Sequence, residues 1–114
     1  MSEGCIFCRI VAGELSAEFV YKDDEIVAFR DIHPGAPVHV LVIPTAHIAS
    51  LAEIVAQHGQ VAGRLLQAAA QIARDLGVEG RGYRTTINTG PDSGSEVGHL
   101  HLHILAGRQM GAMG

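Results

Sequence analysis

Apolar and polar positions in the first half of the chain predict one short helix followed by three strands. Residues 5–12 are a mixed segment ending near Gly13, which is typical of one or two helical turns. The apolar runs at 19–21 and 26–29 flank the turn Asp23-Asp24 and predict a β-hairpin. A third apolar run, 38–43, predicts a strand that Pro44 closes.

The second half changes period and predicts a long helix followed by two strands. Apolar residues recur at helical spacing in the helix predicted for residues 57–76, which follows a short turn at 50–54 and ends before Gly77. Residues 83–88 predict a fourth β segment, and the strict alternation of 99–105 predicts the last strand. We therefore expect an α+β fold, an antiparallel sheet of about five strands with the long helix on one face, in a single domain over residues 1–114.

Charge and composition narrow the class of partner. The chain has 114 residues with 12 acidic and 8 basic side chains, a formal net charge of −4. A weakly acidic surface disfavours extended DNA or RNA, whereas a small anion can still bind in a local pocket. No secretion signal opens the chain and no apolar run is long enough to span a membrane, so we expect a cytoplasmic protein without a membrane partner.

The histidines of the last predicted strand are the strongest chemical signal. His99, His101 and His103 are two residues apart, which places them on one face of a strand, opposite Leu100, Leu102 and Ile104. Three interpretations are open: a half-exposed strand rich in histidine, a zinc site, or phosphoryl transfer with one imidazole as nucleophile. The adjacent loop 90–95, rich in Gly and Ser, favours the phosphoryl chemistry because its backbone N–H groups can bind an anion.

The run 99–105 matches the alternating signature of the histidine-triad (HIT) superfamily, and the similarity covers nearly the whole chain. Further segments resemble the Hint branch of that superfamily, in order and at its spacing; they are residues 5–10, 27–32, 36–44, 47–48 and 106–110. The resemblance implies the HIT-like fold. It also implies hydrolysis of purine nucleoside 5′-phosphoramidates or related nucleotidyl conjugates, with a homodimer as the assembly.

The resemblance assigns roles to individual residues. His101 would attack the α-phosphorus and form a nucleotidyl-histidine intermediate, which water then hydrolyses. His103 and His39 would contact the phosphate or supply the proton that the leaving amine needs. The purine nucleotide would lie against Phe7, Leu15, Phe29, Asp31 (on the ribose), Ile32, Asn88, Gly94, Ser95, Glu96, His101 and His103.

A pair of cysteines, Cys5 and Cys8, begins the chain. In a cytoplasmic protein two cysteines at this spacing indicate a metal or redox site before a structural disulfide. The family resemblance implies a structural zinc held by Cys5, Cys8, His47 and His99, with no catalytic metal. His99 would then serve the metal, and the catalytic group becomes His39, His101 and His103.

Three other functions compete with the phosphoramidase. They are a dinucleoside polyphosphate hydrolase like the Fhit branch, a nucleotide-binding adaptor without catalysis, and a metalloenzyme that uses the histidines as ligands. Two departures from relatives bear on the leaving group. Glu96 replaces a serine found in some relatives, and the chain lacks the C-terminal Trp that in several relatives reaches the partner's active site.

Overall fold

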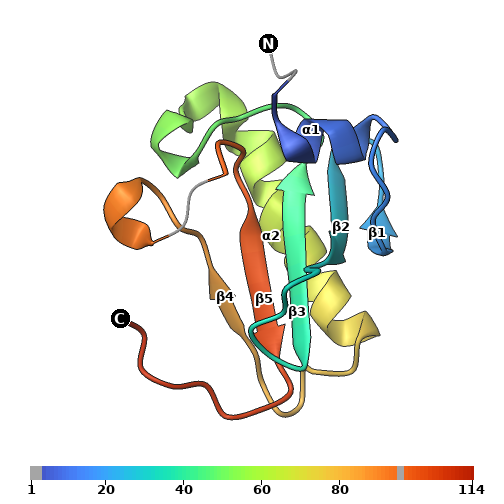
Figure 1. Ribbon diagram of the computed structural model, residues 1–114, viewed down its shortest axis with the longest axis vertical. Helices are drawn as coiled ribbons and strands as arrows, with labels where there is room; N and C mark the ends of the chain where they lie inside the picture. The colour runs from blue at the N-terminus through green and yellow to red at the C-terminus, as the bar shows by residue number, and fades with distance from the viewer. Residues whose placement is uncertain (1–3, 95–96) are drawn as a thin grey trace.

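The computed structural model describes residues 4–94 and 97–114 and is built around one antiparallel sheet (Figure 1). Its strands lie in the order β1-β2-β3-β5-β4. The α+β prediction, with five strands, one long helix and one short N-terminal helix, is confirmed. The elements are α1 (Ile6–Val11), β1 (Phe19–Lys22), β2 (Ile26–Arg30), β3 (Val38–Pro44), α2 (Gly59–Asp75), β4 (Arg84–Thr86) and β5 (Leu102–Ala106), with short 3₁₀ turns at Leu51–Glu53, Ala56–His58 and Pro91–Ser93.

Helix α2 covers one face of the sheet. Its buried residues Leu65, Ala68, Ala69 and Ile72 follow helical spacing and pack against the strand positions Ala28, Val40, Val42 and Ile104, among others. The helix is two residues shorter at its start than predicted, because residues 56–58 form a 3₁₀ turn. It stops as expected before Gly77, which adopts a positive φ of 74°.

Helix α1 lies over the opposite face, in front of the sheet in Figure 1. Phe7 and Ile10, one turn apart, pack on Phe29, Leu41 and Ile43 of β2 and β3. The helix has only six residues, and the Cys5 side chain caps its start by accepting from the Cys8 backbone N–H. A helix this short owes its stability to what it packs against.

The strand register brings distant residues to the same place on the α1 face. In the pairing of β2, β3 and β5, Phe29 lies opposite Leu41, and Leu41 lies opposite His103. His39 lies opposite Leu105, two positions farther along the same face. The sheet therefore gathers an aromatic ring and two imidazoles on the side that α2 leaves open.

The last two strands are shorter than the sequence predicted. β4 covers 84–86 instead of 83–88, and β5 covers 102–106 instead of 99–105. The last pair of the β3–β5 ladder joins Val42 to Leu102, and the Leu100 N–H donates instead to the carbonyl of Ile48, in the loop after β3, at 2.7 Å. Residues 99–101 therefore lie outside the ladder, although their alternation continues that of β5.

Asp23 joins the first hairpin to α2. Its carboxylate accepts from the backbone N–H groups of Glu25 and Ile26, from the Tyr21 hydroxyl and from Arg64 of α2. These bonds, led by the one from Tyr21, lower the pKa of Asp23 to about 2. Among the described residues, no helix has the length and apolar character needed to cross a membrane.

Candidate active site and metal centre

A pocket of about 460 Å³ opens on the α1 face of the sheet. Its volume is within the range of roughly 300–1,000 Å³ that small-molecule sites occupy. Seven of the residues predicted to bind a nucleotide line it together: Phe7, Leu15, Phe29, Asp31, Ile32, His101 and His103. The wall is mainly apolar, and its polar side chains are the two imidazoles, the Asp31 carboxylate, Ser16 and Arg30, which suits a ligand with a flat apolar part and a polar end.

Phe7 forms one side of this pocket and contacts the histidine segment directly. Its ring meets that of Phe29 edge to face at 5.5 Å and that of His101 at 5.3 Å between centroids. The same ring lies 5.9 Å from that of His99. Ile32, in contrast, is 84% exposed and borders the open side, so a bound base would cover it.

The backbone fixes the proton of His101. Its Nδ1 lies 2.8 Å from the carbonyl oxygen of His99, an acceptor, so Nδ1 carries the hydrogen. The lone pair is then on Nε2, the nitrogen that a nucleophile would use. His101 is only 5% exposed, and the ring is held between Phe7 and His103.

A second chain of hydrogen bonds fixes His39 and His103. The Gly35 N–H donates to His39 Nδ1 at 2.9 Å, so the proton of the neutral His39 ring is on Nε2. His39 Nε2 then donates to His103 Nδ1 at 2.8 Å, which leaves the His103 proton on Nε2. The turn at Gly35 therefore sets the tautomer of His103 through one intervening ring, that of His39.

His103 presents this proton where no described residue accepts it. Among the described residues, its Nε2 is the buried side-chain polar atom that has no hydrogen-bond partner. Leaving a buried donor unsatisfied costs about 1–3 kcal/mol, so a ligand that brings an oxygen there gains affinity. Desolvation, with smaller effects from His101 and His39, lowers the pKa of His103 to about 4, so the ring is a neutral donor at pH 7.

Asp31 stands beside His39 as well as in the pocket wall. Its Oδ2 lies 3.5 Å from His39 Nε2, and its Oδ1 accepts from the His33 backbone N–H. Burial lowers the pKa of His39, while the negative charge of Asp31 opposes that shift. The carboxylate therefore has access to the pocket and an electrostatic effect on the same histidine relay.

The remaining predicted nucleotide residues lie elsewhere or outside the described structure. Asn88 lines an adjoining pocket of about 220 Å³, which shares His101 and Val97 with the first. Gly94 is exposed, with a φ of 87°, and lines neither of the two. Ser95 and Glu96 lie outside the described residues.

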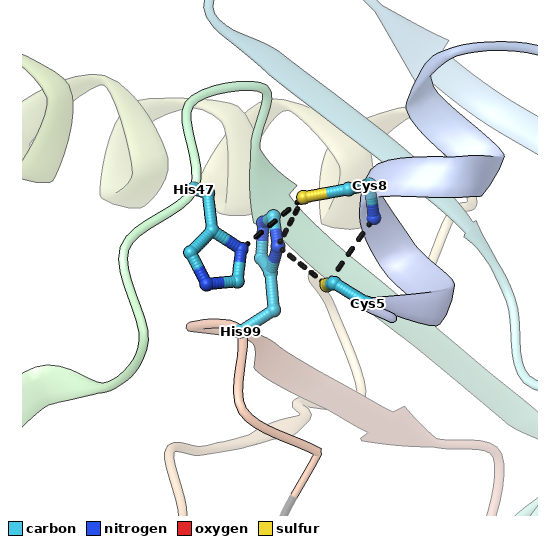
Figure 2. Close-up of side chains that lie close together, drawn as sticks. All are labelled: Cys5, Cys8, His47 and His99. Atoms are coloured by element: carbon cyan, nitrogen blue, oxygen red, sulfur yellow. Dashed lines mark hydrogen bonds between the residues drawn. The ribbon is translucent and has the colours of Figure 1, made fainter. Parts of the chain in front are cut away.

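Cys5, Cys8, His47 and His99 come together at one end of the sheet, as Figure 2 shows. The cysteines come from the start of α1, His47 from the loop after β3, and His99 from the segment before β5. Cys5 Sγ lies 3.3 Å and Cys8 Sγ 3.5 Å from His99 Nδ1, and Cys8 Sγ lies 3.2 Å from His47 Nδ1. The sequence resemblance had grouped the same four residues.

This cluster fits a tetrahedral zinc ion in spacing and in donor chemistry. Zn–S and Zn–N bonds of about 2.3 and 2.0–2.1 Å in tetrahedral geometry place neighbouring ligand atoms about 3.3–3.8 Å apart. His99 Nε2 donates to the Pro44 carbonyl at 3.0 Å, which leaves Nδ1 unprotonated toward the cysteines. Burial lowers the pKa of His99, which favours the neutral form that binds metal.

A second group with metal-ligating side chains, Asp31, His39 and His103, does not fit an ion as well. Ligation through His39 Nε2 would move that ring's proton to Nδ1, where the Gly35 N–H already points. The two N–H groups would then oppose each other. The hydrogen bonds therefore favour a proton relay at this group and a metal at the cysteine cluster.

Several lining residues were not predicted. Ile6, Ile10, Leu41 and Val97 also line the 460 Å³ pocket, while the Gly35 N–H orients His39 and the Pro44 carbonyl orients His99. The helical spacing of Phe7 and Ile10 and the apolar run around Leu41 could have indicated these apolar residues. No side-chain pattern marks a backbone N–H in a Pro-Gly turn.

Comparison with known proteins places these features in a family. The model of the HIT domain matches residues 12–110. A curated protein of Escherichia coli strain K12, named purine nucleoside phosphoramidase, is 43% identical over 113 residues, covering 99% of this chain and 95% of its own.

Solved structures agree with the sequence match. A histidine triad protein from Clostridium difficile superposes with a TM-score of 0.93 at 39% identity, covering 98% of this chain and 97% of that one. A HIT family hydrolase from Clostridium thermocellum gives the same TM-score at 44% identity, covering 96% of both chains. A histidine triad nucleotide-binding protein from Candida albicans gives 0.82 at 27% identity, over 96% and 83%.

Proposed function

Since this chain belongs to the HIT domain family and is a hydrolase of that family, we propose that it cleaves purine nucleoside 5′-phosphoramidates or related nucleotidyl conjugates at the α-phosphorus. The observation that carries the proposal is the pair of fixed tautomers. His101 has its Nε2 lone pair available, and His103 has its Nε2 proton available. A nucleophile and a neutral hydrogen-bond donor therefore stand side by side, with ring centroids 4.9 Å apart, at the edge of an apolar pocket.

In the first step, His101 Nε2 attacks the α-phosphorus and a phosphorus–nitrogen bond forms to the enzyme. The bond from phosphorus to the substrate's amine breaks, and its electron pair leaves with the amine, which takes up a proton from solvent; the water that attacks in the second step releases one in return. The His103 N–H stabilises charge on a phosphoryl oxygen or on the leaving nitrogen. The relay from His39 orients this donor, and losing one such preorganised donor typically costs about 10²–10³ in rate.

In the second step, water attacks the same phosphorus and the bond to His101 breaks. The nucleoside monophosphate leaves, and the histidine returns to its starting tautomer because the His99 carbonyl still holds Nδ1–H. Asp31 would hold the ribose hydroxyls, and Phe29 and Ile32 would hold the base. Asn88 and Gly94, together with Ser95 and Glu96, belong to the proposed phosphate side.

A structural zinc at Cys5, Cys8, His47 and His99 is part of the proposal. The ion would cross-link α1 to the loop after β3 and to the segment before β5. With all four ligand positions taken, it would have no open position for substrate.

The assembly that we propose is a homodimer, and the location that we propose is the cytoplasm. Light scattering of the purified chain tests the homodimer.

The decisive experiment follows adenosine 5′-phosphoramidate through one turnover with wild type and His101→Ala. We expect wild type to form a covalent adenylyl adduct, detected by mass spectrometry after acid-free quenching, and His101→Ala to form none. His33→Ala is the matched control, because His33 is exposed and its ring has no described contact. Hydrolysis that persists in His101→Ala would overturn the mechanism, and faster turnover of diadenosine polyphosphate would change the substrate class.

A further inference from the structure

The side chain of Phe7 lies between the cysteine cluster and the nucleotide pocket. In the sequence Phe7 stands between Cys5 and Cys8, the two residues that the start of α1 contributes to the cluster. In space its ring lies in the wall of the 460 Å³ pocket and is only 6% exposed. A change in how the two cysteines are held therefore reaches the pocket wall through one buried ring.

The ring of Phe7 contacts a histidine of each site. Its centroid lies 5.9 Å from that of His99, a ligand in the proposed zinc site, and 5.3 Å from that of His101, the proposed nucleophile. Both contacts are edge to face, with interplanar angles of 76° and 75°. Because packed interiors transmit small displacements, a shift of this ring alters its contacts in both sites at once.

The helix that carries Phe7 is too short to be stable alone. α1 has six residues, of which Phe7 and Ile10 are buried. The thiols of Cys5 and Cys8 are turned toward the ring of His99, as Figure 2 shows. A metal ion bound by these thiols and a nucleotide packed against Phe7 would each restrict the same short helix.

We infer that Phe7 couples the two sites, so that zinc at the cysteine cluster and a purine nucleotide in the pocket each strengthen the binding of the other. This inference rests on the zinc and the nucleotide proposed above. Whichever ligand binds first orders α1, and the second then binds to a wall that is already in place. Direct attraction between the ion and the phosphate contributes little, because two cysteine thiolates cancel the charge of Zn²⁺. The coupling therefore passes through packed side chains.

The test measures the affinity of AMP by calorimetry for the zinc-loaded chain and for the same chain after chelation. We expect zinc to tighten AMP binding at least about fivefold, within the usual range of coupling between two sites. Linkage requires the same factor in reverse, so saturating AMP should raise the zinc affinity, measured by competition with a chelator, to the same extent. Hydrogen exchange of the α1 amides should slow with either ligand.

Phe7→Leu removes the coupling ring, and Phe19→Leu is its matched control. Phe19 packs in the same apolar cluster and its ring contacts that of Phe29, but it does not line the pocket. We expect Phe7→Leu to bind zinc and AMP with a coupling factor near one, and Phe19→Leu to keep the wild-type factor. A purely structural effect of Phe7→Leu would weaken binding without making the two ligands independent of each other.

Equal AMP affinity with and without zinc would overturn this inference and leave both proposed sites in place. Coupling that survives in Phe7→Leu would also overturn it and would point to His99, whose carbonyl accepts from His101 Nδ1. Absence of AMP binding in both forms would overturn the proposed nucleotide site as well. If chelation unfolds the chain, as judged by circular dichroism, the chelator competition on loaded Phe7→Leu and Phe19→Leu carries the test.

Discussion

The backbone N–H of Gly35 donates to His39 Nδ1 at 2.9 Å and so decides which nitrogen of that ring carries the proton. Replacing Gly35 with proline removes the donor. We expect Gly35→Pro to lower kcat for phosphoramidate hydrolysis by at least about tenfold, because the His39 to His103 relay loses its fixed direction. The measurement is steady-state kinetics with adenosine 5′-phosphoramidate.

Gly35→Ala is the control for this substitution. It keeps the N–H, and its Cβ would meet its nearest neighbour, His39 Nδ1, at an ordinary 3.7 Å. We expect kcat within about twofold of wild type. Equal loss in both variants would mean that the shape of the turn matters and the hydrogen bond does not.

Acid should destabilise the protein through His103. Burial lowers its folded pKa to about 4, below the ordinary value of 6.5, so the unfolded chain binds a proton first as pH falls. The contribution to the free energy of unfolding is therefore complete above pH 6.5 and is lost as pH falls toward 4. We expect a loss of about 1–3 kcal/mol over this window, reduced by the partial exposure of the ring.

Urea unfolding at several pH values measures this effect, with His103→Gln as the comparison. The variant cannot take up the proton, so its stability should fall less between pH 6.5 and 4. His99 and His39 also have lowered pKa values and contribute to the loss that both proteins share. Parallel curves for the two proteins would contradict the assignment to His103.

Removing metal should loosen the α1 end of the molecule. We expect one zinc per chain by elemental analysis, and a melting temperature lower by several degrees after chelation, because α1 then loses two of its anchors. Cys8→Ser should bind less metal and show no further loss with chelator. A protein purified without zinc whose melting temperature does not respond to added zinc would contradict the metal site.

Gly107 offers a test of backbone geometry. Gly107→Ala combines a positive φ with a Cβ 2.7 Å from Pro37, whereas Gly13→Ala has a positive φ of 82° and open space. Gly13→Ala should cost about 1–2 kcal/mol for the left-handed conformation alone. Gly107→Ala should cost more, because Pro37 must also move. Equal losses in thermal unfolding would show that the turn yields without strain.

The sequence predicted this fold well because its helices and strands have clear periods. The alternation around His103 and the helical spacing of Leu65 and Ile72 reflect burial on one face, and the continuous apolar run around Leu41 reflects burial on both faces of the sheet. Strand ends were less predictable: residues 99–101 have the alternation of a strand, but the ladder between β3 and β5 stops at the pair of Val42 with Leu102.

The site was predictable in its residue types and not in its hydrogen bonds. The histidine spacing and the family resemblance named His101 and His103, and the resemblance grouped Cys5 and Cys8 with two distant histidines. The tautomers depend on the carbonyl of His99 and the N–H of Gly35. Every residue has these backbone groups, so only the folded geometry reveals which ones matter.

Alternation in β5 also limits how this protein can evolve. His103 and Leu105 face the pocket side, while Leu102 and Ile104 face α2. Deleting a single codon within this strand would exchange the two sets, sending an imidazole into the core and an aliphatic chain into the pocket. Substitutions in β5 can therefore alter the side chains of the pocket one at a time, whereas a single-residue deletion would disrupt the pocket and the hydrophobic core together.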